Sequence, residues 1–403
     1  MGAIRYWLWL SGQGGVSPQA RSALIGHYGD AERAFFAPAG EYEKIPGISK
    51  TEAARLEKRE LSVAERILAD CAGQGVESIT MQDAAYPKIL RNIFAPPVVL
   101  YVKGKLPDLE AIPTVAVIGT RKASSYGLKM GRQLAFDIAR SGGAVISMLS
   151  DGIDKHAALG CIQADGCCIG VLGTGHGTEN GFYRDIVSTG ALISEYPPNT
   201  PSQRHFFRER NRIASGLARA VVVVEAPEKS GALLFASEAL EQGREIFAVP
   251  GNADAPNSVG TLELIKQGAK PVTCGWDVLG ELEYLFPDSI KKPDNNFRLP
   301  ELPDEKRLSM DTKPPESQET TKKYVDNVKP SGYIDLHEQL SSLNEDQLKI
   351  ITAIEGDDTH IDDIIEKTGL STAKVLAQLT VLEIRGFVRR SAGRRISLNI
   401  KSK

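Results

Sequence analysis

The sequence has no apolar run long enough to cross a membrane. The apolar N-terminal run YWLWL, residues 6–10, falls far short of the roughly 20 residues that a spanning helix needs. No small-residue cleavage site follows it, and Tyr6 stands where N-myristoylation requires Ser or Thr. We therefore expect a buried first helix in a cytoplasmic protein that makes no membrane contact.

Cysteine is also scarce. The five cysteines are odd in number and lack C-x-x-C spacing; they are Cys71, Cys161, Cys167, Cys168 and Cys274. This pattern argues against a disulfide framework and against a metal site. We expect reduced thiols in the core and no bound metal.

Neither an excess of one charge nor a nucleotide-binding motif is present. The chain has 48 basic and 51 acidic residues, a net charge of −3. This near balance does not exclude nucleic acid, because local clusters of basic residues decide such binding. The motifs G-x-x-x-x-G-K-[ST] and G-x-G-x-x-G are both missing. The sequence therefore predicts no cofactor.

What the chain does contain is a series of short apolar runs between Pro113 and Val224, separated by segments of helical period. The runs lie in PTVAVIGTR, GGAVIS, CCIGVLGTG, GALISEY and ARAVVVVE. Strands that are apolar on both sides belong to a mostly parallel sheet covered by helices on both faces. The fold class is therefore α/β, with ligands expected beyond the carboxyl ends of the strands.

The remaining segments predict a multidomain organisation. Residues 1–80 read as a small helical domain with a helix-hairpin-helix turn at Ile45–Ile48, and residues 81–286 as the sheet domain, with VVLYVKG as an added edge strand. Residues 287–342 are rich in proline and charge and are expected to be a disordered linker. Residues 343–403 predict three helices and a β-hairpin, with Gly369 at the bend between two helices.

Two segments of the sheet domain suit an anionic ligand. After the first run, the turn Gly119, Thr120, Arg121 and Lys122 can cradle a phosphate through backbone N–H groups. The segment 204–212 carries four arginines and three rings against one acid; these are Arg204, Arg208, Arg210 and Arg212, with His205, Phe206 and Phe207, and Glu209. Arginine forks bind phosphate and aromatic faces stack on unpaired bases, so this mixture indicates single-stranded nucleic acid. The alternative is a solvated basic helix start with both phenylalanines in the core.

No catalytic arrangement is evident. The acid–base candidates are Asp151, Asp154, His156, Glu195 and Glu225, but none has a nucleophile at a recognisable spacing. We expect Asp154 and His156 to cap a helix, and we expect no enzymatic activity.

The motifs, in their order along the chain, resemble the DNA-processing protein A family, also called Smf. They are GTR, DGID, VLGTG, SEYPP, FxxRNRIxSGL, VVVVEAxxKSGAL, ALEQGREIFAVPG and GTLxLIxQGA, covering about residues 110–285. The resemblance implies an extended Rossmann-like fold and a SAM-like N-terminal domain. It also implies binding of single-stranded DNA, loading of the RecA recombinase in natural transformation and recombination, and a homodimer without established catalysis.

The resemblance and the residue pattern give one candidate site. Gly119, Thr120 and Arg121 match the family's G-[ST]-R turn, and Phe207, Arg210, Asn211 and Arg212 match its F-x-x-R-N-R motif. The full candidate set is Gly119, Thr120, Arg121, Lys122, Arg204, Phe207, Arg208, Arg210, Asn211 and Arg212. The last domain resembles the family's winged helix, whose basic hairpin suits duplex DNA through Arg389, Arg390, Arg394 and Arg395, or else serves as a protein-interaction module.

The chain departs from the family pattern at several positions. Asp151 enters a strand-end loop, Ala158 replaces a histidine, Glu263 stands where asparagine is expected, and the loop 176–185 is shortened. These changes leave two other functions open. One is a Rossmann-like enzyme that binds or hydrolyses nucleotides using Glu225 and the glycine turns, although PGNADAPNSVGTLE matches its P-G-G-x-G-T-x-x-E motif only loosely. The other is a purely regulatory winged-helix protein.

Overall fold

The computed structural model describes residues 2–177, 181–292, 343–354, 359–384, 387–391 and 395–398. The chain divides into two compact units, Met1–Pro303 and Asp304–Lys403. Most of the predicted linker, residues 293–342, lies outside the described residues. No helix within the described ranges is long and apolar enough to span a membrane.

The first unit begins with five short helices around a core of large apolar side chains. They are α1 (Ile4–Gly12), α2 (Pro18–Tyr28), α3 (Ala31–Phe35), α4 (Lys50–Leu56) and α5 (Ser62–Gln74). Trp9, Leu24 and Tyr42 are fully buried among them. The predicted turn at Ile45–Ile48 precedes α4, and Gly47 adopts φ +91°, which favours glycine. The predicted helical character of this region is confirmed.

Nine strands form one sheet in the described part of this unit. They are β1 (Glu77–Thr80), β2 (Val99–Gly104), β3 (Thr114–Ile118), β4 (Ala144–Ser147), β5 (Cys168–Val171), β6 (Ala191–Ser194), β7 (Ala220–Val223), β8 (Glu245–Ala248) and β9 (Lys270–Pro271). Their order is β1-β2-β6-β5-β4-β3-β7-β8-β9. The pairings from β6 to β9 are parallel, whereas β1–β2 and β2–β6 are antiparallel.

The predicted parallel sheet is confirmed, but the place of one strand was wrong. The five apolar runs that predicted it are β3 to β7, whose residues are all buried. The segment VVLYVKG is indeed a strand, β2, yet it does not form the edge. The edge is β1, which pairs with β2 from Glu77 to Thr80. The mostly polar run ESIT gave no strand signal, so β2 appeared to have a free side.

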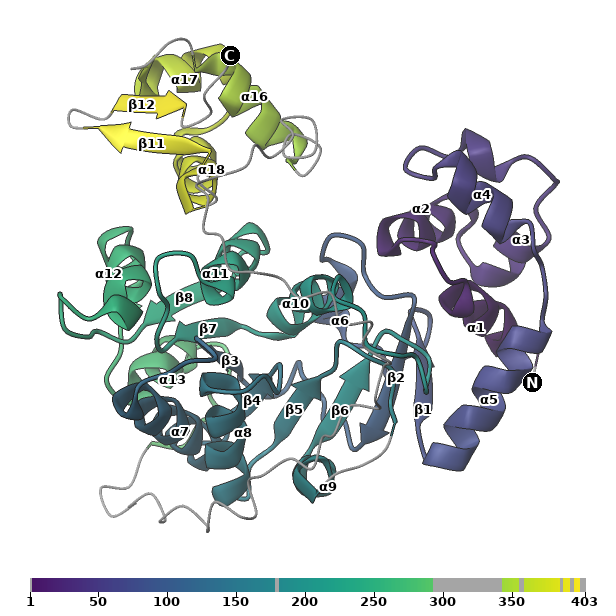
Figure 1. Cartoon of the computed structure of the whole chain (residues 1–403), viewed down its shortest axis with the longest axis horizontal. Helices are drawn as coiled ribbons and strands as arrows, with labels where there is room; N and C mark the ends of the chain where they lie inside the picture. Colours follow the sequence, from purple (N-terminus) through teal and green to yellow (C-terminus); the bar gives the residue numbers. More distant parts are fainter. Residues whose placement is uncertain are drawn as a thin grey trace, which may run out of the picture. The chain divides into compact units, whose positions relative to one another are not determined.

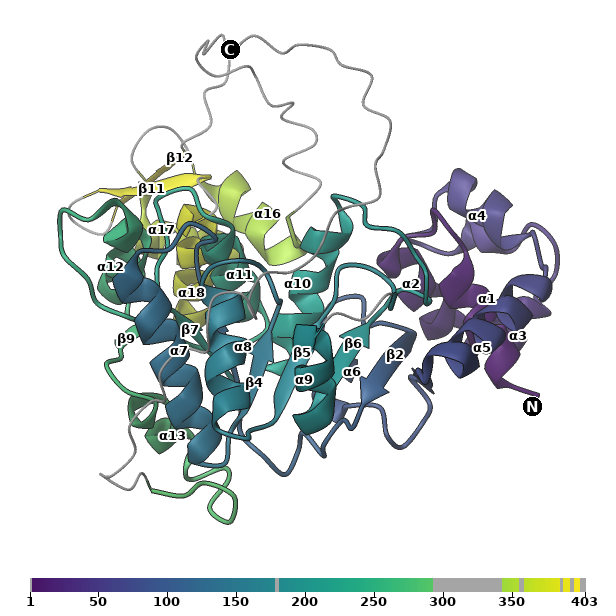
Figure 2. The ribbon, with the colours of Figure 1, turned by 60° about the horizontal axis from the view of Figure 1, so that its bottom comes forward.

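Helices cover both faces of the sheet. In Figures 1 and 2, α7 (Ser125–Arg140), α8 (Ile153–Gln163) and α9 (Gly181–Thr189) lie along one face, while α10 (Phe206–Leu217) and α11 (Gly231–Glu241) lie along the other. Three short helices complete the unit, namely α6 (Lys88–Arg91), α12 (Val259–Lys266) and α13 (Trp276–Leu282). Helices α7 and α8 pack closely, since a Cβ on Gly160 would lie 2.1 Å from the backbone oxygen of Arg132.

The second unit is a small winged helix. It contains α16 (Glu345–Ala353), β10 (Thr359–His360), α17 (Ile361–Thr368), α18 (Thr372–Ile384), β11 (Val388–Ser391) and β12 (Arg395–Leu398). The described residues confirm the predicted three helices and hairpin, and β10 adds a third strand beside β12. Gly369 ends α17 at φ +65°, as the predicted bend requires. Arg389 and Arg395 are exposed on the hairpin, and Arg390 lies in β11, whereas Arg394 lies outside the described residues.

Candidate nucleic-acid interface

The turn after β3 lies at the carboxyl edge of the sheet and is held from both sides. The backbone N–H of Thr120 donates to the carbonyl of Glu225 at 2.8 Å, and the N–H of Ile153 donates to the carbonyl of Thr120 at 3.4 Å. Gly152 adopts φ +84°, and a Cβ there would lie 2.4 Å from that same carbonyl. The turn is therefore fixed by the ends of β7 and β4, while Arg121 and Lys122 remain exposed on it.

The N-terminus of α7, which follows this turn, is filled by an internal carboxylate. Glu225 is buried and accepts hydrogen bonds from the backbone N–H and the hydroxyl of Ser124 and from Asn257 Nδ2. A Cβ on Gly127 would lie 2.4 Å from this carboxylate. A helix N-terminus in this position commonly binds a ligand phosphate. Here the protein's own anion takes that place, which argues against the nucleotide-binding alternative.

Arg210 forms the floor of the site. Its side chain is 5% exposed and donates from Nη1 to the carbonyl of Met148 at 2.7 Å. Its guanidinium also lies 5.4 Å from the ring centre of Phe207. Burial lowers the pKa of Arg210 to about 10, with Asp154 opposing that effect, so the side chain stays charged at neutral pH. A desolvated cation therefore lies at the ends of β4 and β5.

Asp154 is the acid that faces this cation. Burial raises the pKa of Asp154 to about 7, although Arg210, the Gly119 N–H, Ser150 and Arg121 all lower it. One of its oxygens, Oδ1, is buried and has no hydrogen-bond partner among the described residues. Asp154 was expected to cap a helix, but that prediction was wrong, because the residue at the N-terminal cap of α8 is Gly152. His156, in contrast, satisfies a local backbone group as expected, since its Nδ1 lies 2.9 Å from the Gly152 carbonyl.

The raised pKa makes stability depend on pH through Asp154. Its ordinary pKa is 3.8, so between about pH 4 and pH 7 the folded protein holds a proton that the unfolded chain releases. The free energy of unfolding contributed by this group therefore falls as the pH rises through that window. Asp154→Asn removes the titration, so the variant should lose less stability between pH 5 and pH 7.5 in urea unfolding. Asp151→Asn, at an exposed neighbour, should behave like the parent; an unchanged pH dependence in Asp154→Asn would contradict the assignment.

Arg212 points into the protein instead of toward the turn. It is 6% exposed and pairs with the buried carboxylate of Glu195 at 2.5 Å. The ring of Tyr196, the next residue, stacks on Phe206 with centres 3.9 Å apart, and its hydroxyl donates to Glu209 at 2.7 Å. These contacts dock α10 onto the end of β6.

The aromatic residues lie at the boundary between core and surface. Phe206 and Phe207 are both half-buried, so neither the exposed nor the core alternative describes them fully. The ring of Phe206 stacks on Tyr196. Phe207 lies against Gly173, and a Cβ added to Gly173 would come within 3.0 Å of the Phe207 ring. A side chain at residue 173 would therefore require the Phe207 ring to shift by a few tenths of an ångström from the end of β5.

The structure sorts the candidate set by exposure. Arg121, Lys122, Arg204 and Arg208 are exposed, Gly119, Thr120, Phe207 and Asn211 are half-buried, and Arg210 and Arg212 are buried. Sequence reasoning missed the roles of Glu195, Tyr196 and Asn257, although the motif SEYPP did mark the first two. Among the departures, Asp151 is exposed and Ala158 is buried in α8, while residues 178–180 of the shortened loop lie outside the described residues. The described residues hold no cluster of metal-ligating side chains.

Comparisons with known proteins find similar sequences and a similar overall fold. The family model for DNA recombination-mediator protein A matches residues 77–283, and the model for the DprA winged helix domain matches residues 336–394. DNA processing protein DprA of Bacillus subtilis is 40% identical over 222 residues, 54% of this chain and 75% of that protein. Protein Smf of Synechocystis is 31% identical over 97% of both chains. The X-ray structure of DprA from Streptococcus pneumoniae superposes with a TM-score of 0.60 at 30% identity, covering 70% of this chain and 99% of that one.

Proposed function

Because this chain belongs to the DNA recombination-mediator protein A family, we propose that it binds single-stranded DNA at the carboxyl edge of its sheet and serves in DNA recombination. The family model matches residues 77–283, which include the sheet, and a relative named DNA processing protein DprA is 40% identical over 222 residues. The resemblance to the family extends the proposal to loading of RecA during natural transformation, in the cytoplasm and without catalysis. Binding and positioning of the strand are then the whole activity of this site.

One observation carries the proposal, namely two exposed cations on a turn that the fold holds rigid. Arg121 and Lys122 project from a backbone fixed by Glu225 and Ile153. Such a turn binds phosphate without first paying the entropy of ordering a loop. Arg204 and Arg208, both exposed at the start of α10, extend the positive surface. The other candidate residues in this domain position these cations at the carboxyl edge of the sheet.

The buried arginines have positioning roles in this proposal. Arg210 holds the ends of β4 and β5 through the carbonyls of Met148 and Val171, and Arg212 anchors α10 to Glu195. The N–H of Thr120 already donates to the Glu225 carbonyl and the N–H of Gly119 to Asp154, so these residues hold the turn in place instead of binding phosphate through those groups. Asn211 is half-buried on α10, between the two arginines in sequence. Exposed Asp151 places a negative charge near the phosphate path and should weaken binding modestly.

The test is fluorescence anisotropy of the full chain with labelled single-stranded and duplex oligonucleotides over a range of salt concentrations. We expect preference for the single strand and a steep loss of affinity with salt, because each neutralised phosphate adds about 0.7 to the slope of log affinity against log salt for single strands. Equal affinity for both forms, or binding that is indifferent to salt, would contradict the proposal.

Phe207 provides a test of base stacking. Phe207→Leu keeps an apolar side chain against Gly173 but removes the aromatic face, and stacking of one base on an aromatic ring is worth about 1–3 kcal/mol. We expect single-strand affinity to fall by about 5- to 100-fold with little change in duplex binding. Phe206→Leu is the control, since that ring already stacks on Tyr196. Equal effects of the two variants would remove Phe207 from the site.

The proposed function also includes duplex DNA contact by the winged helix and formation of a homodimer. We expect the winged helix to contact duplex DNA through Arg389 and Arg395, both exposed on its hairpin, with Arg390 and Arg394 as further candidates. Homodimer formation and RecA contact rest on the family resemblance. The division into domains at residues 80, 286 and 342 is likewise a proposal, which limited proteolysis would test.

A further inference from the structure

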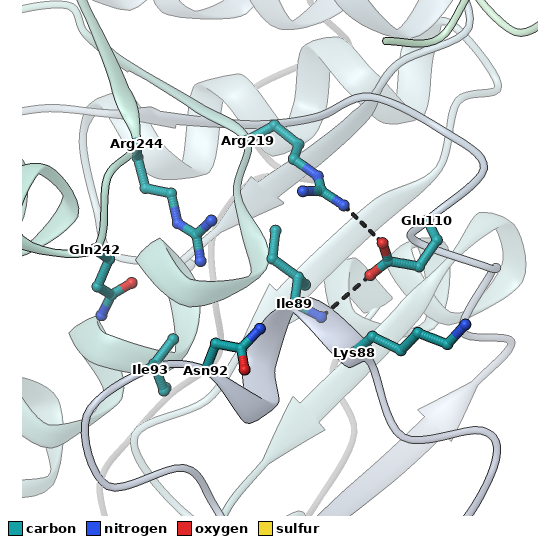
Figure 3. Close-up of a pocket in the computed structure, with 8 residues that line it drawn as sticks. All are labelled: Lys88, Ile89, Asn92, Ile93, Glu110, Arg219, Gln242 and Arg244. Atoms are coloured by element: carbon teal, nitrogen blue, oxygen red, sulfur yellow. Dashed lines mark hydrogen bonds and ion pairs between the residues drawn. The ribbon is translucent and has the colours of Figure 1, made fainter.

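A second concentration of positive charge lies at the opposite edge of the sheet. Arg219 directly precedes β7 and Arg244 directly precedes β8, so both lie where strands begin. The turn with Arg121 lies where β3 ends. Together with Lys88 and Asn92, the two arginines line a pocket of about 230 Å³ (Figure 3).

The charges of this pocket do not balance. Three cations, Lys88, Arg219 and Arg244, face one carboxylate, Glu110. That carboxylate is already engaged, because it accepts from Arg219 Nη2 at 2.8 Å and from the backbone N–H of Ile89 at 3.1 Å. Burial and the nearby charge of Arg219 lower the pKa of Arg244. The lining therefore carries two positive charges in excess, and an anion would offset their repulsion.

The arginines also retain unused donors. The Nε atoms of Arg219 and Arg244 are buried and have no hydrogen-bond partner in the described part of the chain. Figure 3 shows the guanidinium of Arg244 extending toward the space between Gln242, Ile89 and Asn92. Gln242 lines one side of the pocket. Its side chain is held there because its amide donates to the Arg212 carbonyl and its oxygen accepts from Ser215. These Nε atoms are enclosed by protein, so a ligand in the pocket would meet the outer nitrogens of the guanidinium groups. Arg244 Nη2 donates to the carbonyl of Gly216 at 2.9 Å, which orients that group.

We propose that this pocket binds the phosphate group of inorganic phosphate or of a small phosphate ester, with Arg244 as the principal donor. Guanidinium matches the geometry of phosphate oxygens, and Arg219 and Lys88 supply charge. A pocket of about 230 Å³ is large enough to hold such a group.

Isothermal titration calorimetry of the full chain at constant ionic strength tests this inference, with inorganic phosphate and glycerol 3-phosphate as the probes. We expect saturable binding of one or both. Arg244→Gln should weaken it by about tenfold, because it removes a charge-assisted hydrogen bond, and Lys88→Ala by a smaller factor. Arg91→Ala, in α6 but outside the pocket lining, is the control. Circular dichroism would verify that each variant folds.

Four results would overturn the proposal. The first is no saturable binding of either probe, and the second is binding that neither Arg244→Gln nor Lys88→Ala weakens. The third is loss of phosphate binding in Arg121→Ala with retention in Arg244→Gln, which would place the anion at the turn on the other edge. Displacement of the probes by an oligonucleotide in the Arg121→Ala background would identify a DNA phosphate as the ligand and reject the small-molecule assignment.

Discussion

Arg121→Ala is expected to weaken binding of single-stranded DNA by about tenfold to a hundredfold. The side chain is exposed on a turn fixed by Glu225 and Ile153, so it meets a phosphate without reorganisation of the backbone. A hydrogen bond to a charged group is worth about 1.5–3 kcal/mol, and each 1.4 kcal/mol is a factor of ten. Loss of one phosphate contact should also reduce the magnitude of the salt slope by about 0.7.

A matched control exists on the helix that follows the turn. Arg140 is exposed in the last turn of α7, about 22 Å from the start of that helix, because each residue adds about 1.5 Å. Arg140→Ala removes the same charge from the protein and should leave affinity and salt slope nearly unchanged. If both variants lose affinity equally, binding depends on overall charge, and the turn is not the site. Anisotropy titrations at three salt concentrations distinguish these outcomes.

Arg212→Ala is expected to reduce the free energy of unfolding of the first unit by about 3–5 kcal/mol. The substitution removes the partner of Glu195, whose carboxylate is buried, and an uncompensated buried charge is costly. It also releases the start of α10 from the end of β6. Urea unfolding followed by tryptophan fluorescence would measure the change.

Two comparisons separate the ion pair from simple loss of packing. The double variant Arg212→Met with Glu195→Gln replaces both charges by neutral side chains of similar size and should recover most of the lost stability, because such replacements are often neutral. Lys266→Ala breaks a surface pair whose side chains are 74% and 52% exposed, so it should cost less than about 1 kcal/mol. A cost for Arg212→Ala as small as that of Lys266→Ala would show that the buried pair does not stabilise the fold.

The sequence predicted the parallel sheet well because its strands are apolar on both sides. The runs TVAVI and AVVV have no solvent-facing position, and only a sheet covered on two faces satisfies them. The edge strand β1 was missed since ESIT is only partly buried and gains its partner from a segment 20 residues away. A local sequence pattern shows that a strand is buried on both sides, but it does not show which distant segment pairs with an edge strand.

The candidate site was predicted as a set of residues, but their orientations were not. Arg208 and Arg212 are four residues apart on α10 and should share a face, yet one is exposed and the other buried. The difference arises because Glu195, at the end of β6, covers only the second. Glu225 likewise reaches Ser124 across 101 positions in the sequence. Such partners are set by the topology of the sheet, which residue spacing does not reveal.

The most direct test of the central claim is hydrogen–deuterium exchange of the full chain with and without a single-stranded oligonucleotide. The proposed interface predicts slowed exchange in peptides that cover Gly119–Ser124 and the start of α10, with little change at the turn Ile45–Ile48. Protection confined to the winged helix, or to the helices of residues 1–76, would contradict the assignment of the DNA site to the carboxyl edge of the sheet.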